Sequence, residues 1–267
     1  YPLIGNYGIA EKFNESDRAW TAGLIIKEYS RIYSNWQARS SLEDFAKEQG
    51  LFILDGVDTR TLAVHLRQKG EMLGIISPEG PSAKELSSKL DAFRARAAES
   101  VLPQISVGKP VVLPSAKARG TKIAVLDVGM TRSVLRQLQR LGFSTTVLPY
   151  NTRPADIIAG RFRGLIISGG PEEDPGLEVV VDTARGLMGK IPLMGISAGH
   201  QALARALGAK IARLKLGHRG ANYPMHNPGS QQGEITVQNH GLVVDAESLA
   251  KIKQVKITGY NLNDHSV

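Results

Sequence analysis

Short apolar runs alternate with amphipathic segments along the second half of the chain. From Lys122 onward the pattern predicts strands at KIAVLDV, TTVLPY, GLIISGG and PLMGIS, and helices at SVLRQLQRLG, PADIIAG, LEVVVDTARGLMG and HQALARALG. Strands that alternate with helices indicate a parallel sheet covered by helices on both faces. We therefore expect an α/β fold with a doubly wound, mostly parallel sheet in this half.

The pattern before it predicts a smaller mixed α/β domain. Ser41–Gly50 and Asp58–Gly70 each start at a helix-capping residue and stop at a glycine, as helices do. AKELSSKLDAFRARAAE predicts a third helix, and LFILDGV and MLGIIS are short apolar runs typical of strands.

A segment rich in proline, glycine and serine separates the two halves. PQISVGKPVVLPSAKARGTK shows little periodicity, which is typical of an interdomain linker. The sequence thus predicts an N-terminal domain over residues 1–105, a linker over 106–120 and the doubly wound domain over 121–267.

Composition narrows the class of protein. A chain of 267 residues with 42% hydrophobic and 22% charged residues has the make-up of a soluble globular protein. No apolar run is long enough to span a membrane, and YPLIGNYGIAEKF lacks the features of a signal peptide. We expect a cytoplasmic protein without a membrane association.

Charge and cysteine content exclude further classes. The net charge of +8 comes from Lys and Arg that are scattered, as in RARAAES and KARGTK, rather than gathered in one stripe with aromatic residues. This favours a solvated basic surface over nucleic-acid binding. Without cysteine the chain has no disulfide, no thiolate metal site and no thiol nucleophile.

Three loops follow predicted strands and should meet at one edge of the sheet. They are DVGMTR (127–132), SGGPEEDPG (168–176) and GISAGHQ (195–201). Ligands of such sheets bind beyond the carboxyl ends of the strands, so the three loops can line one pocket. None of them matches a phosphate-binding loop, which disfavours nucleotide binding in this domain.

GISAGHQ has the layout of a nucleophile elbow, a tight turn between a strand and a helix. Such a turn lifts its central residue, here Ser197, toward the N–H groups at the helix start, a geometry suited to acyl transfer. GISAG also fits the G-x-S-x-G pattern of serine hydrolases, which need an acid and then a histidine later in the chain. The later histidines, at 200, 218, 226, 240 and 265, show no context distinctive of a base.

The elbow more closely resembles the GICxGHQ elbow of class I, triad-type glutamine amidotransferases. Other stretches, on both sides of the predicted linker, are similar to the small chains of carbamoyl-phosphate synthetase. They are YPLIGNYG, SNW, GVDTR, GHRGANYP and QNHG. The resemblance therefore covers nearly the whole chain, and GVDTR together with QNHG is specific to the small chains.

The resemblance implies both an activity and its partners. In that family an elbow cysteine attacks the side-chain amide of L-glutamine, forms a thioester and releases ammonia, which passes to a large synthetase chain. The small chain would have no metal or cofactor of its own, while ATP and Mg²⁺ would bind the large chain. The complex would serve pyrimidine and arginine synthesis.

The resemblance also implies roles for individual residues. Ser197 occupies the place of the nucleophile. The backbone N–H groups of Gly170 and Ala198 would form the oxyanion hole. The residues that would hold the glutamine substrate are Gln201, Asn239, Gly241 and Leu242.

Two positions depart from the family pattern in the loop SGGPEEDP. The family usually has SNGPGDP, so Gly169 replaces asparagine and Glu172 stands where a second glycine would approach the substrate. A carboxylate there would crowd or repel the carboxylate of glutamine. The resemblance further implies that a segment precedes Tyr1 and that an HPE motif, which supplies the catalytic histidine and glutamate, follows Val267.

A serine at the elbow should remove most of the glutamine hydrolysis, because a hydroxyl ionises far less than a thiol near neutral pH. Three origins stay open: a natural ammonia-using relative, an engineered replacement of cysteine, or a retuned serine enzyme. The alternative function is a non-catalytic structural and regulatory subunit that supports ammonia-dependent synthesis.

Overall fold

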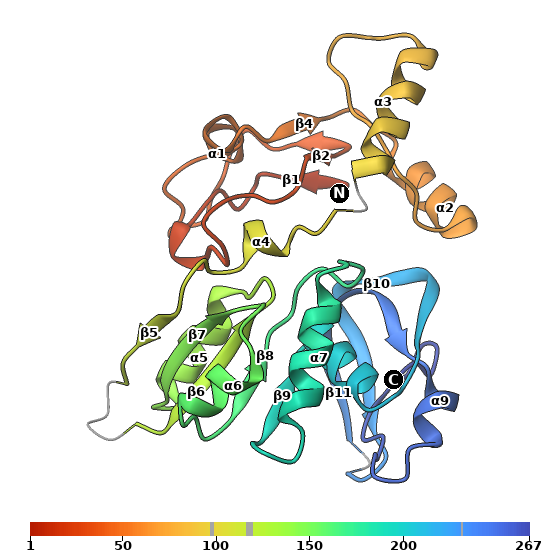
Figure 1. Ribbon diagram of the computed structural model, residues 1–267. Coiled ribbons are helices and arrows are strands. Elements are labelled where there is room, and N and C mark those ends of the chain that lie inside the picture. The colour runs from red at the N-terminus through yellow and green to blue at the C-terminus, as the bar shows by residue number, and fades with distance from the viewer. Residues whose placement is uncertain (97–98, 116–119, 231) are drawn as a thin grey trace. The chain divides into compact units, whose positions relative to one another are not determined.

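The computed structural model describes residues 1–96, 99–115, 120–230 and 232–267. The chain divides into two compact units, Tyr1–Ala95 and Arg96–Val267, and Figure 1 labels most of their elements.

The first unit contains short strands and three α-helices. Strand β1 pairs with β3 and β2 with β4, both in parallel, so two small two-stranded sheets result. The elements are β1 (Leu3–Ile4), the 3-10 helix η1 (Glu11–Phe13), β2 (Gly23–Ile25), β3 (Glu28–Tyr29), α1 (Leu42–Gln49), β4 (Phe52–Leu54), α2 (Thr59–Lys69) and α3 (Ala83–Arg96).

Capping side chains set the helix starts as the sequence predicts. Ser41 Oγ accepts a hydrogen bond from the Asp44 backbone N–H, and the Asp44 carboxylate accepts one from the Ser41 backbone N–H, which makes a capping box. Gly50 ends α1 in the left-handed conformation. Asp58 caps α2 through the Thr61 N–H at 3.0 Å, and Gly70 follows its last residue. Both helix predictions are confirmed, and α3 confirms the third as far as Arg96, since residues 97–98 lie outside the described part.

One strand prediction in this unit is wrong. MLGIIS (72–77) has no regular structure, and Met72 and Leu73 are exposed. A strand needs a neighbour to pair its backbone groups. In the described part of this unit, β2 pairs with β4 instead, and β4 lies in the predicted run LFILDGV.

The second unit is built on a five-stranded sheet in the order β5-β7-β6-β8-β9. Strands β6 to β9 are parallel, and β5 is an antiparallel edge strand. The elements up to the elbow are α4 (Leu102–Ile105), β5 (Val111–Leu113), β6 (Lys122–Asp127), α5 (Arg132–Arg140), β7 (Ser144–Pro149), α6 (Pro154–Ala159), β8 (Leu165–Ile167), α7 (Leu177–Leu187), β9 (Leu193–Gly195) and α8 (Ala198–Ala206).

Both faces of the central strand are buried, which is why its sequence is a continuous apolar run. Ile123 and Val125 of β6 pack with Leu138 of α5 on one face. Ala124 and Leu126 face the opposite way, into the main core formed with α6, α7 and α8. Helices therefore cover both faces, and the predicted doubly wound, mostly parallel sheet is confirmed.

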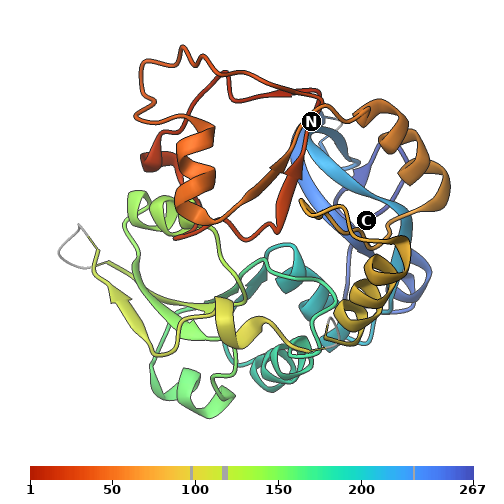
Figure 2. The ribbon, with the colours of Figure 1, turned by 90° about the horizontal axis from the view of Figure 1, so that it is seen from above.

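A long antiparallel hairpin follows the sheet, and the sequence patterns did not predict it. It consists of β10 (Ile211–Asn227) and β11 (Gln232–Val244), blue in Figures 1 and 2. Helix α9 (Ala246–Ala250) comes next, and β12 (Tyr260–Asn261) pairs with β10. Most side chains of both long strands are exposed or only partly buried, so the strands lack the buried apolar runs that mark the central sheet.

The predicted domain boundary differs from the division in the structure. Most of the segment 99–115 belongs with the sheet: Leu102 is fully buried in the core, Val107 N–H donates to Asp127 at 2.9 Å, and residues 111–113 form β5. Proline and glycine are as typical of an edge strand and its loops as of a linker, so composition did not distinguish them. Residues 116–119 of the predicted linker lie outside the described part.

Asp174 fastens this segment to the loop after β8. Its buried carboxylate accepts hydrogen bonds from Ser100 Oγ at 2.5 Å, Val101 N–H at 2.6 Å and Gly176 N–H at 2.8 Å.

We expect Asp174→Ala to lower the free energy of unfolding by about 3 kcal/mol, because buried donors lose a charged acceptor. Urea denaturation followed by far-UV circular dichroism measures this. Asp182→Ala, at an exposed ion pair with Arg185, is the control and should change stability by less than about 0.5 kcal/mol. Equal stability of the two variants would contradict the assigned role.

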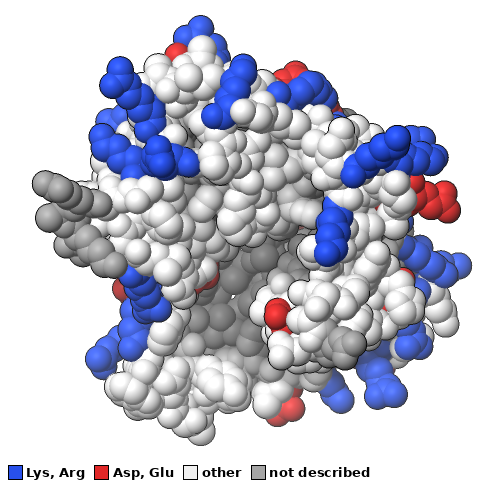
Figure 3. Space-filling model, turned by 90° about the horizontal axis from the view of Figure 1, so that it is seen from below, with Lys and Arg blue, Asp and Glu red and all other residues white. Residues whose placement is uncertain are grey.

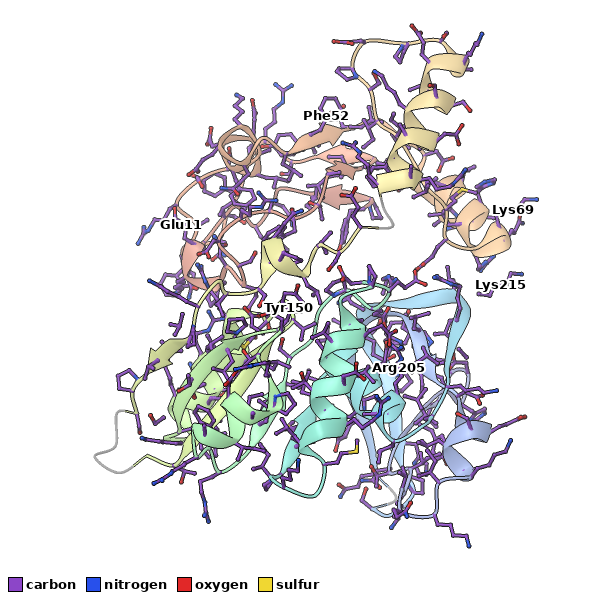
Figure 4. The ribbon with its side chains drawn as sticks, in the orientation of Figure 1. Glu11, Phe52, Lys69, Tyr150, Arg205 and Lys215 are labelled. Atoms are coloured by element: carbon purple, nitrogen blue, oxygen red, sulfur yellow. The ribbon has the colours of Figure 1, made fainter. Side chains whose placement is uncertain are left out.

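Charged side chains are spread over the surface. Lys and Arg do not form one stripe on the face shown in Figure 3. In the second unit some of them form ion pairs between elements: Arg205 of α8, labelled in Figure 4, pairs with Glu178 of α7, and Arg213 of β10 pairs with Glu173. Within the described residues no helix is both long and apolar enough to cross a membrane.

Candidate active site

Ser197 lies at the turn between β9 and α8, with backbone angles φ 52° and ψ −116°. A positive φ is uncommon for a residue with a side chain, and holding one costs on the order of 1 to 3 kcal/mol. Such strain persists only where the surrounding structure enforces it, which is the hallmark of a nucleophile elbow. The predicted elbow is therefore present in the structure.

Close backbone approaches explain the two glycines that flank Ser197. A Cβ atom at Gly195 would lie 2.4 Å from the carbonyl oxygen of Gly199. One at Gly199 would lie 2.2 Å from the carbonyl oxygen of Ile167, at the end of β8. The G-x-S-x-G spacing is thus a steric requirement of a turn pressed against the neighbouring strand, whatever the chemistry of the central residue.

The loops after β6, β8 and β9 meet at this point, as the strand order predicts. Val128 N–H donates to Ser168 Oγ at 2.9 Å, which joins the first two loops. A Cβ atom at Gly169 would lie 3.3 Å from the Cβ of Ser197, so the second loop lies beside the elbow. Gly170 is in that loop, and Ala198 is the buried first residue of α8, whose first N–H groups have no partner within the helix. Their role as an oxyanion hole stays a prediction.

The structure brings together three of the four residues expected to hold the substrate. Gln201 Nε2 donates to the Leu242 carbonyl at 3.1 Å, which joins α8 to β11. The same nitrogen donates to Glu172 Oε1 at 2.5 Å, and Gly241 N–H donates to Glu172 Oε2 at 2.6 Å. The Glu172 carboxylate therefore bridges Gln201 and Gly241, two of the residues that are expected to bind the substrate glutamine.

The fourth residue, Asn239, lies farther along β11, opposite Arg219 of β10. It lines a cavity of about 600 Å³ together with Ser197, Gln201 and Leu242. His200 lines the same cavity, and desolvation by partial burial lowers the pKa of its imidazole.

A second, small cavity lies where Glu172 enters the site. Its volume is about 90 Å³, and its lining lacks Ser197. The lining residues are Glu172, Leu177, Ala198, Gln201, Ala202, Arg205, Ile211 and Leu242.

A polar cluster that sequence reasoning missed lies under the hairpin, centred on buried His218 of β10. His218 Nδ1 lies 2.7 Å from Gln238 Oε1 and 3.2 Å from His240 Nε2, while its Nε2 lies 2.9 Å from Asp264 Oδ2. Asn261 Nδ2 donates to Gln238 Oε1 at 3.0 Å. The cluster joins side chains from GHRGANYP, QNHG and NLND (261–264). The recurrence of His, Asn and Asp in these three stretches is the sequence signal from which it could have been predicted.

Asp264 stays ionised in this cluster. Burial opposes its charged form, but hydrogen bonds from Ser266 and His218 outweigh that effect and hold the pKa of the carboxyl below its usual range. The cluster therefore ties β10, β11 and the C-terminal segment together.

The geometry gives the serine-hydrolase alternative no support. Within the described part of the chain, no histidine makes a hydrogen bond to the Ser197 hydroxyl. His218 and His240 use their ring nitrogens within the polar cluster, where His240 Nδ1 also lies 2.9 Å from the Leu242 carbonyl oxygen.

Comparison with known proteins finds one family model for each part of the chain. The family model "Glutamine amidotransferase class-I" matches residues 124–267, and "Carbamoyl-phosphate synthase small chain, CPSase domain" matches residues 1–76. A glutamine amidotransferase of Thermotoga maritima, a solved structure, is similar at a TM-score of 0.43 and 17% identity, with 55% of this chain and 70% of that one covered.

Curated relatives align over the whole chain. The carbamoyl phosphate synthase small chain of Symbiobacterium thermophilum is 37% identical, with 100% of this chain and 74% of the relative covered. The small chain of Bacillus caldolyticus is also 37% identical, with 100% and 72% covered, and that of Chlorobaculum tepidum is 36% identical, with 100% and 73% covered. The relatives are 36 to 37% identical over the whole of this chain, and the structure contains the elbow and the converging loops. The chain therefore belongs to the family of carbamoyl phosphate synthase small chains, the glutamine amidotransferase subunits of that enzyme.

Proposed function

We propose that this chain works in a complex with a large synthetase chain and supports carbamoyl phosphate synthesis, while Ser197 impairs its own hydrolysis of glutamine. The observation that carries the proposal is the strained elbow with a serine at its tip. ATP and Mg²⁺ would bind the large chain, and this chain would need no cofactor. The complex would act in the cytoplasm, in pyrimidine and arginine synthesis.

The proposed chemistry uses the roles that the family resemblance assigns to Ser197 and to two backbone donors. The Ser197 oxygen would attack the side-chain amide carbon of glutamine, and the N–H groups of Gly170 and Ala198 would stabilise the oxyanion that develops. Ammonia would leave with the proton given up by the hydroxyl, and water would hydrolyse the ester to glutamate. The weak step is the first one, because a serine hydroxyl stays protonated at neutral pH and needs an aligned base.

The second candidate function is a non-catalytic subunit that supports synthesis from ammonia. The observation that favours it is the Glu172 carboxylate, which occupies two donors, Gln201 Nε2 and Gly241 N–H, on the substrate side of the elbow. Under this function the elbow would be retained as part of the fold.

Two assays on the purified complex with the large chain test the proposal. We expect carbamoyl phosphate to form from ammonium, and the rate with glutamine to be lower by a factor of at least about 100, because a hydroxyl is a far weaker nucleophile than a thiolate. A small glutamine-dependent rate would support the impaired enzyme, and none at all would support the non-catalytic subunit. Equal rates with the two nitrogen donors would contradict both.

A further inference from the structure

Glu172 makes two short, charge-assisted hydrogen bonds across the candidate site. It reaches from the loop after β8 to Gln201 of α8 and to Gly241 of β11, at 2.5 and 2.6 Å. Each carboxylate oxygen takes one donor, so the side chain bridges two elements that its own loop does not belong to.

These donors suit the substrate as well as they suit Glu172. Glutamine carries a carboxylate and a side-chain carbonyl, and both accept hydrogen bonds from amide N–H groups of this kind. A substrate that needed either donor would have to displace Glu172, which is attached to the site and so has a high effective concentration there.

We propose that Glu172 is an internal ligand that closes the glutamine subsite. The inference rests on the proposed function, because it takes this pocket as the place where glutamine would bind. Glu172 would thus prevent glutamine from binding, and this effect is independent of the weak nucleophile Ser197.

The space left beside Glu172 agrees with a closed subsite. The cavity between Glu172, Ala198, Gln201 and Leu242 measures about 90 Å³. Pockets that bury small ligands measure about 300 Å³ or more. The cavity of about 600 Å³ that Ser197, Gln201 and Asn239 line does not include Glu172, so the carboxylate closes the part of the site beside Gln201 and Gly241.

The neighbouring contacts hold Glu172 in this position. Gln201 Nε2 has two hydrogens, and the Leu242 carbonyl accepts the second one at 3.1 Å, which fixes the amide toward Glu172. Two residues along the loop, Asp174 is anchored by Ser100, Val101 and Gly176. The adjacent Glu173 points elsewhere and pairs with Arg213.

The absence of cysteine from the chain makes a direct test possible. Ser197→Cys introduces a single thiol at the elbow, which serves as a reporter of access. Two probes would be compared by intact mass: iodoacetamide, which needs only a reactive thiol, and a glutamine analogue that carries a chloroketone in place of the side-chain amide. The ratio of the two labelling rates measures access to the glutamine subsite, and neither rate requires turnover or a catalytic base.

We expect a low ratio in Ser197→Cys and a rise of roughly 10- to 100-fold when Glu172→Gly is added. That range corresponds to a subsite that Glu172 keeps closed for about 90 to 99% of the time. Glu172→Gln keeps the shape of the side chain and one acceptor oxygen, so it should give a smaller rise in the ratio. It replaces Glu172→Gly in the test if that variant has a much lower melting temperature. Glu173→Gly is the matched control and should leave the ratio unchanged.

The proposal would be overturned by an unchanged ratio in both Glu172 variants with iodoacetamide labelling intact. It would also be overturned if the analogue labelled Ser197→Cys alone as fast as the double variant, with free glutamine protecting the thiol. A complex that failed to make carbamoyl phosphate from ammonium would reject the proposed function, yet the labelling ratio would still report on Glu172, so the two failures are distinguishable.

Discussion

Replacing Gly170 by alanine is expected to disrupt the carboxyl-terminal edge of the sheet. A Cβ atom at Gly170 would lie 1.8 Å from the Val128 carbonyl oxygen and 2.8 Å from its carbonyl carbon, far inside van der Waals contact. Both neighbours are backbone atoms at the end of a buried strand, so they cannot move without shifting β6. We expect the free energy of unfolding to fall by about 3 kcal/mol or more.

Hydrogen exchange of the β6 and β8 amides measures this effect locally, and the protection of both strands should drop together. Gly108→Ala is the matched control in the same unit, because among the described residues no atom beyond its own chain neighbours lies within 4 Å of the added methyl group. If the β6 and β8 amides of Gly170→Ala were as protected from exchange as those of the control, the loop could move to accommodate the methyl group. The steric explanation for this glycine would then be wrong.

The second large effect concerns turnover in the complete complex with the large chain. In a Glu172→Gly background, Ser197→Cys is expected to raise glutamine-dependent synthesis by a factor on the order of 100 or more, because a thiolate is a far better nucleophile than a hydroxyl. The expected oxyanion donors at Gly170 and Ala198 are backbone groups, so the exchange at 197 leaves them in place.

Ser197→Cys alone should recover only part of this activity. If the Glu172 carboxylate keeps the subsite closed, the apparent affinity for glutamine falls by roughly 10- to 100-fold, and rates at several glutamine concentrations separate this loss from a loss of kcat. Ammonium-dependent synthesis in the same preparations is the control for an intact complex. Full activity from the single exchange would show that the loop SGGPEEDP is harmless, and no activity from either variant would favour the non-catalytic subunit.

The central sheet was the most predictable part of the molecule. The predicted runs KIAVLDV, GLIISGG and PLMGIS contain β6, β8 and β9, and TTVLPY contains all of β7 except Ser144. A buried strand of a parallel sheet reads as a near-continuous apolar run, and β6 is the plainest case. The capped helices α1 and α2 were predictable because Ser41, Asp58 and the closing glycines act locally.

Features that depend on pairing between distant segments were not predictable in the same way. The predicted strand MLGIIS has no regular structure, while the exposed hairpin β10–β11 extends over QNHG without an apolar run to mark it. Residues 111–113 lie in a segment rich in proline, glycine and serine, yet they form an edge strand because they pair with β7.

The sequence by itself determined the fold class, the position of the elbow and the residue at its tip, because buried strands, helix caps and glycine turns are encoded within a few neighbouring residues. Only the tertiary structure decided what occupies the site. Glu172 stands 29 residues before Gln201 and 69 before Gly241 in the chain, and its two hydrogen bonds exist because β8, α8 and β11 converge. Directional contacts of this kind depend on angstrom-scale placement, which periodicity and composition do not record.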